Sequence, residues 1–152
     1  MKNLIVALLL CSTLTTFAQK SNFSGNWTLD KNKTDFHGAP EWVLPRYLKV
    51  EQQADKLTLT RTAVNEDMEE QMPVTETLSF DSTPSIRKSD SGPEVTTTLK
   101  WTNDMSFTLI RKGAQEATED WWLEDGGKTL VLNRKVRNNV GSYTIKSYYA
   151  KP

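Results

Sequence analysis

Cysteine and histidine are nearly absent from this sequence of 152 residues, which contains one of each, Cys11 and His37. Cys11 falls in an N-terminal segment that we expect to be cleaved, so the mature chain would have no disulfide and no thiol nucleophile. His37 stands alone in a loop with Gly38 and Pro40, and a histidine metal site or a Ser-His-Asp triad therefore lacks its parts. The sequence predicts a protein that is not an enzyme, with no metal and no cofactor.

An excess of charge of either sign is also missing, because 19 basic residues face 19 acidic ones. Such a balance does not favour nucleic acid or an anionic membrane as a partner. The longest apolar run, residues 4–10, is far shorter than the roughly 20 residues that span a bilayer. We therefore expect no nucleic-acid binding and no membrane insertion.

The first 18 residues have the layout of a secretory signal peptide. Lys2 gives a short positive region, residues 4–10 an apolar stretch, and Thr16-Phe17-Ala18 a small-x-Ala cleavage signal. Cleavage after Ala18 would leave residues 19–152, which no repeat or linker divides. The sequence thus predicts a secreted or periplasmic protein with one domain.

Alternating apolar residues dominate the remaining chain and favour an all-β fold. The clearest case is residues 116–136, where two alternating runs flank Asp125-Gly126-Gly127, a sequence typical of a hairpin turn. Short loops join the runs, which indicates an antiparallel up-and-down meander of 8 to 10 strands closed into a barrel. We predict strands near residues 26–30, 46–53, 56–62, 72–80, 85–89, 94–101, 105–111, 117–123, 129–136 and 142–149.

The longest stretch without strand character is 31–45. Pro40 and Pro45 exclude a long helix there, although one helical turn could form around Phe36 or Trp42.

Residues 23–29, Phe-Ser-Gly-Asn-Trp-Thr-Leu, carry a pattern F-x-G-x-W-x-L that resembles the start of calycin barrels, the lipocalins and fatty-acid-binding proteins. Residues 30–36 resemble the corresponding part of small secreted bacterial proteins described as lipocalin-like. The resemblance implies a ligand-binding barrel with Trp27 plugging one end. The last strand, 143–149, has tyrosines but not the Arg-x-Tyr pair with which fatty-acid-binding proteins hold a carboxylate.

Five charged residues share the apolar phase of their strands and should point into the barrel: Arg61, Glu76, Arg111, Glu119 and Arg134. In a meander all five lie toward the same mouth. They could form a ligand entrance with an arginine free for an anionic head group, or they could simply pair with each other. Three arginines against two glutamates leave Arg134 unmatched, and it is the best candidate for an anion contact.

We therefore expect a non-catalytic binding protein for a small apolar or amphipathic ligand, acidic ligands included. The alternative is a structural or interaction barrel with a filled core and a partner surface around Trp42 and Trp122. A third possibility, an enzyme with Glu76 and Glu119 as acid and base, needs only two carboxylates. The candidate ligand-binding residues are Arg134, Arg111, Arg61, Tyr149, Tyr143, Glu119, Glu76, Trp121 and Phe107.

Overall fold

The computed structural model describes residues 19–88 and 92–152. The expected signal peptide and Ser89, the last residue of the strand expected at 85–89, lie outside the described residues.

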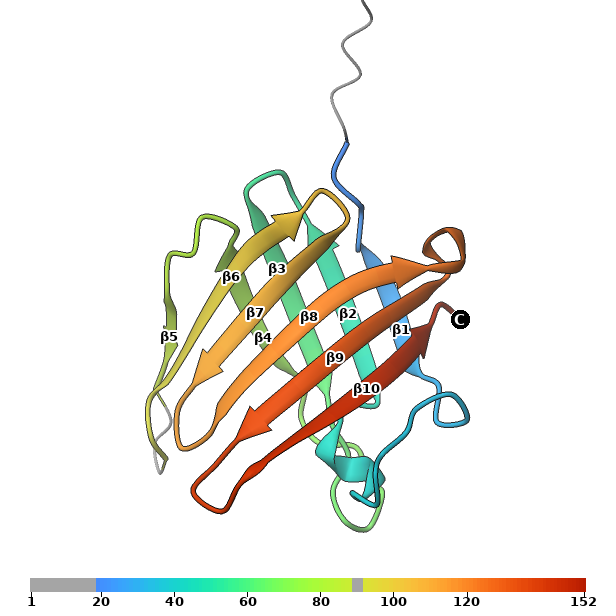
Figure 1. Cartoon of the computed structure of the whole chain (residues 1–152), viewed down its shortest axis with the longest axis vertical. Coiled ribbons are helices and arrows are strands. Elements are labelled where there is room, and N and C mark those ends of the chain that lie inside the picture. The colour runs from blue at the N-terminus through green and yellow to red at the C-terminus, as the bar shows by residue number, and fades with distance from the viewer. Residues whose placement is uncertain (1–18, 89–91) are drawn as a thin grey trace, which may run out of the picture.

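The described chain forms one ten-stranded antiparallel sheet that curls into a barrel (Figure 1), as the sequence predicts. Neighbouring strands follow the order β4-β3-β2-β1-β10-β9-β8-β7-β6-β5, so the first strand pairs with the last. The elements are β1 (Gly25–Leu29), η1 (Glu41–Val43), β2 (Tyr47–Gln52), β3 (Lys56–Thr62), β4 (Val74–Ser79), β5 (Ser85–Arg87), β6 (Val95–Asn103), β7 (Ser106–Lys112), β8 (Glu116–Glu124), η2 (Asp125–Gly127), β9 (Thr129–Arg137) and β10 (Ser142–Ala150).

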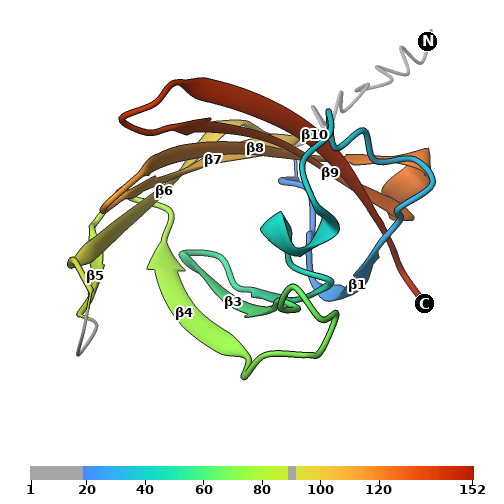
Figure 2. The ribbon, with the colours of Figure 1, turned by 90° about the horizontal axis from the view of Figure 1, so that it is seen from below.

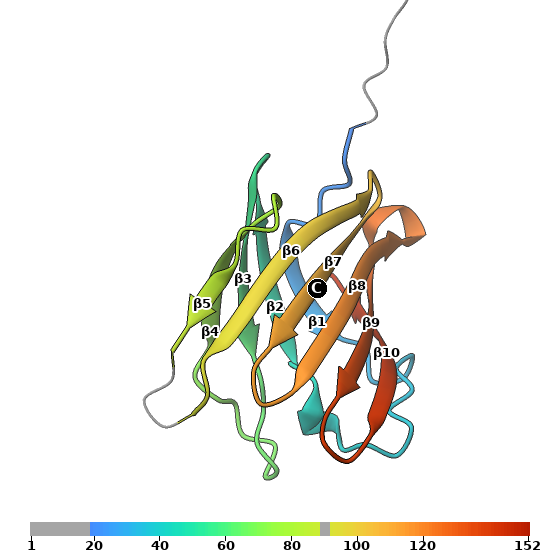
Figure 3. The same cartoon turned by 60° about the vertical axis from the view of Figure 1, so that its left-hand side comes forward.

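The barrel is nearly closed, because the hydrogen-bonded order ends at β4 on one side and at β5 on the other. The chain crosses this seam at the end of β4. Asp81 forms an isolated bridge with Lys100 of β6, and the Ser82 amide donates to the Leu99 carbonyl over 3.1 Å. Figures 2 and 3 show β1 to β4 facing β6 to β10 across the interior, with β5 at the seam.

The hairpin of β8 and β9 turns as the sequence indicates. Asp125, Gly126 and Gly127 all have positive φ angles, of 52°, 64° and 87°, and together form the short 3-10 turn η2. Glycine adopts this conformation without the steric cost that a side chain brings. The turn sets a register in which Glu119 lies directly opposite Arg134, toward the other end of the hairpin.

Five aromatic rings fill the barrel interior on the side of the η2 turn, and we call them the aromatic cluster: Phe23, Phe80, Trp101, Phe107 and Trp121. Phe107 is at its centre, with ring centroids 4.7 Å from Phe23 and 5.2 Å from Trp121. Phe80 stacks on Trp101 at 4.6 Å. The offset and edge-on contacts add to the stabilisation from burial alone.

Trp27, which the resemblance assigns to one barrel end, is buried on β1. Its indole N–H donates to the Phe23 carbonyl over 3.0 Å, so the polar atom of the buried ring is satisfied.

The segment between β1 and β2 contains one helical turn, η1, around Trp42, as expected from the sequence. Viewed from below, η1 lies across the barrel opening (Figure 2). Leu44, directly after η1, is only 2% exposed and belongs to the hydrophobic core. We call residues Glu41 to Pro45 the plug.

Candidate functional site

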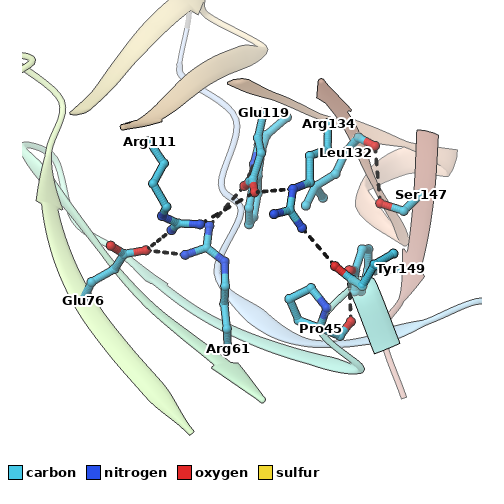
Figure 4. A network of polar contacts seen from close by, with 11 residues as sticks. Pro45, Arg61, Glu76, Arg111, Glu119, Leu132, Arg134, Ser147 and Tyr149 are labelled. Atoms are coloured by element: carbon cyan, nitrogen blue, oxygen red, sulfur yellow. Dashed lines mark hydrogen bonds and ion pairs between the residues drawn. The ribbon is translucent and has the colours of Figure 1, made fainter. Parts of the chain in front are cut away.

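Charged side chains from five strands meet inside the barrel next to the plug (Figure 4). We call them the charge network: Arg61 on β3, Glu76 on β4, Arg111 on β7, Glu119 on β8 and Arg134 on β9. The strand alternation predicted that these five would face inward. They meet because their strands all bring them toward the mouth opposite the η2 turn.

Arg61 lies between the two carboxylates. One of its terminal nitrogens donates to Glu76, and the other donates to Glu119 Oε2 over 3.0 Å. Arg111 donates to the same Glu76 oxygen over 2.6 Å and lies 4.0 Å from Glu119 Oε1. The ion pairs therefore run across the barrel between strands distant in sequence, and not only within hairpins.

Glu119 is the most deeply buried member, at 3% exposure. Burial alone would raise its pKa, but the positive charges of Arg61, Arg111 and Arg134 outweigh burial and lower the pKa to about 2. The indole N–H of Trp121 also donates to Glu119 Oε2, over 3.2 Å. Glu119 is thus held as a carboxylate, and it joins the charge network to the aromatic cluster.

The pKa of Arg111 is also lowered, which for an arginine disfavours the charged form. Burial lowers the pKa of its guanidinium, and the neighbouring Arg61 and Arg134 lower it further, against the effect of Glu119 and Glu76. Three arginines share two carboxylates here, which leaves an excess of positive charge inside the barrel.

Arg134 is not the free arginine that the charge count indicated. One of its terminal nitrogens donates to the Val43 carbonyl of the plug over 3.0 Å, and its Nε lies 3.7 Å from Glu119 Oε1. The simple count was wrong because it ignored backbone acceptors from the segment 31–45. The buried Nε still has no hydrogen-bond partner.

Tyr149, on β10, also holds the plug. Its hydroxyl donates to the Pro45 carbonyl over 3.0 Å. Burial raises the pKa of this phenol, and the nearby Glu119 raises it further, so the hydroxyl stays protonated and able to donate.

A cavity of about 460 Å³ lies between the plug and the charge network. The apolar part of its wall comes from the plug, the end of β3 and the start of β4: Trp42, Val43, Leu44, Pro45, Ala63, Met72 and Val74. Gln71, Arg87 and all five members of the network complete it. Four arginines against two glutamates make the wall positive.

The other predicted site residues lie elsewhere. Trp121 and Phe107 are behind the network, in the aromatic cluster, and do not line the cavity. Tyr143 has the inward phase of β10 but is 41% exposed at the start of that strand, away from the cavity wall. Sequence reasoning missed the plug, because it belongs to no alternating pattern that predicts direction. It missed Arg87 because Ile86, the one apolar residue of the strand expected at 85–89, has the opposite phase.

Trp122 faces outward, as its phase predicts, and is half-buried. Its indole N–H donates to Glu124 over 2.9 Å, and Lys146 Nζ lies 5.3 Å from the ring centroid. Trp42 is 39% exposed and lines the cavity, whereas Trp122 borders a different surface depression. The two tryptophans therefore do not share one cavity.

Two features are absent from the described residues: a metal-type cluster and a membrane-spanning helix. Within 19–88 and 92–152 there is no group of three or more His, Cys, Asp or Glu side chains placed to hold a metal ion. In the same ranges no helix has the length and apolar character needed to cross a membrane.

No family model matches the sequence, and no curated protein sequence matches it. Solved structures do match. A fatty-acid-binding protein of Schistosoma mansoni in complex with arachidonic acid has a TM-score of 0.58 at 13% identity, covering 86% of this chain and 96% of that one. The ileal bile acid-binding protein of zebrafish, complexed with cholic acid, has a TM-score of 0.56 at 14% identity, covering 86% and 98%.

A third structure, an abundant heat soluble (SAHS) protein of Ramazzottius varieornatus, has a TM-score of 0.61 at 12% identity, covering 85% of this chain and 94% of that one. At such identities the likeness shows the fold alone. The chain has the calycin barrel fold of the fatty-acid-binding proteins.

Proposed function

We propose that this protein binds a small amphipathic acid in the cavity between the plug and the charge network. The observation that carries the proposal is the charge of the cavity wall, where four arginines face two glutamates. An anionic group placed there would offset the excess positive charge. Charge-assisted hydrogen bonds of this kind are stronger than neutral ones, more so away from water.

The remaining wall suits an apolar body. Trp42, Val43 and Pro45 on one side and Met72 and Val74 on the other present carbon surface to the cavity. A cavity of about 460 Å³ lies within the range of small-molecule sites, which combine apolar walls with a few polar groups that fix orientation. The acid would thus bind with its charge inward and its apolar part toward the mouth.

The structural neighbours support this proposal. Two of them were solved with arachidonic acid and with cholic acid, and both of these molecules are amphipathic acids. The N-terminal sequence supports a place of action outside the cytoplasm, so we propose that the protein works after export, in the periplasm of a bacterium or outside the cell.

The two rival functions find less support. Glu119, with its pKa lowered to about 2, is a poor proton donor, whereas a hydrolase that works with two carboxylates needs one with a raised pKa. An interaction barrel with a filled core would leave no place for the cavity at the mouth, and Trp122 is half-buried with Lys146 near its ring.

The test is a fluorescence titration with 1-anilinonaphthalene-8-sulfonate, an anionic apolar probe, followed by its displacement with octanoate. Arg134→Leu and Arg111→Met should each weaken octanoate binding by roughly 10- to 100-fold, the effect of losing one charged hydrogen bond. Arg111→Met is included because Arg111 does not bond to the plug.

Arg137→Leu is the matched control, since Arg137 is on the same strand as Arg134 but exposed on the outer face. The affinity of the Arg137→Leu variant for octanoate should equal that of the native protein. Octanoate affinity that stays unchanged in both site variants, with folding verified by circular dichroism, would show that the proposal is wrong.

A further inference from the structure

We infer that the cavity is sized for compact acids, with a ring system or a short chain, and that a longer fatty-acid chain gains no further affinity from it. The inference rests on the proposed function and adds the class of ligand. It follows from what closes the cavity on two sides. The charge network closes it toward the barrel interior, and we call this side the floor. The plug closes it toward the barrel opening, and we call this side the roof.

The floor separates the cavity from the rest of the barrel interior. Glu119 lines the cavity, whereas Trp121, which donates to Glu119, and Phe107, stacked on Trp121, do not. Both rings are fully buried. The alkyl chain of a bound acid could pass deeper into the barrel only by displacing close-packed rings and by separating buried ion pairs.

Separating those pairs is costly because their side chains are largely buried. Arg61 bonds to Glu76 and to Glu119 at once, so moving its guanidinium would break two ion pairs between side chains that are at most 13% exposed. Buried charges that lose their partner cost several kcal/mol. The floor therefore acts as a barrier to an apolar chain.

The roof is held from inside the barrel. Arg134 donates to the Val43 carbonyl and Tyr149 donates to the Pro45 carbonyl, each over 3.0 Å. Between these two anchors the Leu44 side chain is packed into the core. This arrangement makes Leu44 a specificity-determining residue, because its side chain lines the cavity from the anchored segment and limits how much of a longer alkyl chain the cavity can bury.

The cavity opens sideways instead, toward Met72. Met72 lines the cavity and is 87% exposed, so the wall at that point faces solvent. An alkyl chain longer than the cavity would extend into solvent there, and its outer carbons would gain little burial. Affinity should therefore stop rising with chain length once the cavity is filled.

The first experiment uses the native chain and measures affinity by calorimetry for a series of straight-chain acids, from hexanoate to hexadecanoate, below their critical micelle concentrations. Octanol serves as the uncharged control. Affinity should rise to octanoate or decanoate and then level off or fall, with 2-naphthoate binding at least as tightly as octanoate. Affinity that rises steadily to hexadecanoate would overturn the inference and leave the proposed function standing. If no acid binds better than octanol, the proposed function fails, and the inference fails with it.

The second experiment removes the roof side chain. Leu44→Ala should increase the affinity for hexadecanoate relative to octanoate by about tenfold, since each buried CH₂ contributes about 0.8 kcal/mol. Leu78→Ala is the matched control, because Leu78 is equally buried in the core but does not line the cavity. In this variant the affinity for hexadecanoate relative to octanoate should not change. An unchanged ratio in a folded Leu44→Ala variant would overturn the role of Leu44. If that variant does not fold, the chain-length profile of the native protein decides the inference.

Discussion

Aromatic rings fill one half of the barrel interior, and charged side chains around a cavity occupy the other. The same strands build both halves: β7 carries Phe107 near its start and Arg111 near its end, and β8 carries Glu119 before Trp121. In the aromatic half the rings contact each other directly. In the charged half the side chains form direct ion pairs with each other and line the cavity.

The difference shows where stability and specificity come from. Burial of apolar rings contributes stability in proportion to the area removed from water. A buried ion-pair network contributes little or no net stability, because desolvation of the charges offsets their attraction. The charged half therefore fits the proposed binding of an acid better than a contribution to folding, and three variants test this contrast.

The largest effect should come from Phe107→Ala, which removes the central ring of the aromatic cluster. We expect a loss of about 3 to 5 kcal/mol in the free energy of unfolding, because the removed ring leaves a cavity among rigid neighbours. Urea denaturation followed by circular dichroism measures it. Met105→Ala, a change at an exposed side chain two residues away, should stay within about 0.5 kcal/mol. Equal losses in the two variants would contradict a packed aromatic half.

The second-largest loss of stability should come from Glu119→Gln, and this loss should depend on pH. The pKa of Glu119 is lowered from 4.5 to about 2, so it lies below the value in the unfolded chain. The resulting stability is fully present above about pH 4.5 and is lost as the pH falls toward 2. At pH 7 we expect Glu119→Gln to lose roughly 3 kcal/mol, and its stability should then fall less steeply than that of the native protein on acidification.

Urea denaturation at pH 7, 4 and 2.5 measures both effects. Glu94→Gln is the control, since Glu94 is an exposed residue just before β6. Stability curves of the native protein and Glu119→Gln that run parallel over this range would contradict the ionised, arginine-held state of Glu119.

The smallest effect should come from Arg111→Met. Arg111 lies among like charges, and without it Glu76 still bonds to Arg61, and Glu119 still has Arg61 and Arg134 nearby. We expect the free energy of unfolding to change by less than about 1 kcal/mol, since a similar apolar side chain replaces a buried charge that has no exclusive partner. A loss as large as that of Glu119→Gln would mean that the network behaves as one structural unit, and the contrast between the two halves would fail.

Much of this architecture could be predicted from the sequence. Alternation of apolar residues predicts the strands and indicates that Glu119 and Arg134 face inward near one mouth, and the Asp125-Gly126-Gly127 turn predicts the hairpin that carries both. These inferences hold because side-chain direction in a strand depends only on position along that strand.

The parts that could not be predicted involve contacts between distant segments. Arg134 was expected to be free, yet it bonds to Val43, 91 residues earlier. Tyr143 has the same phase as Tyr149, but only Tyr149 extends to the plug. Phase gives the direction of a side chain, and it does not give the partner found there.

The sequence by itself determined the all-β class, the strand order of a meander and the set of inward charges, because these follow from local periodicity and turn chemistry. Only the tertiary structure decided that β1 pairs with β10, that the plug enters the mouth, and that Glu119 is shared by three arginines. Closure of the barrel brings distant residues together, and the energy of a buried charge depends on every neighbour that the closed barrel provides.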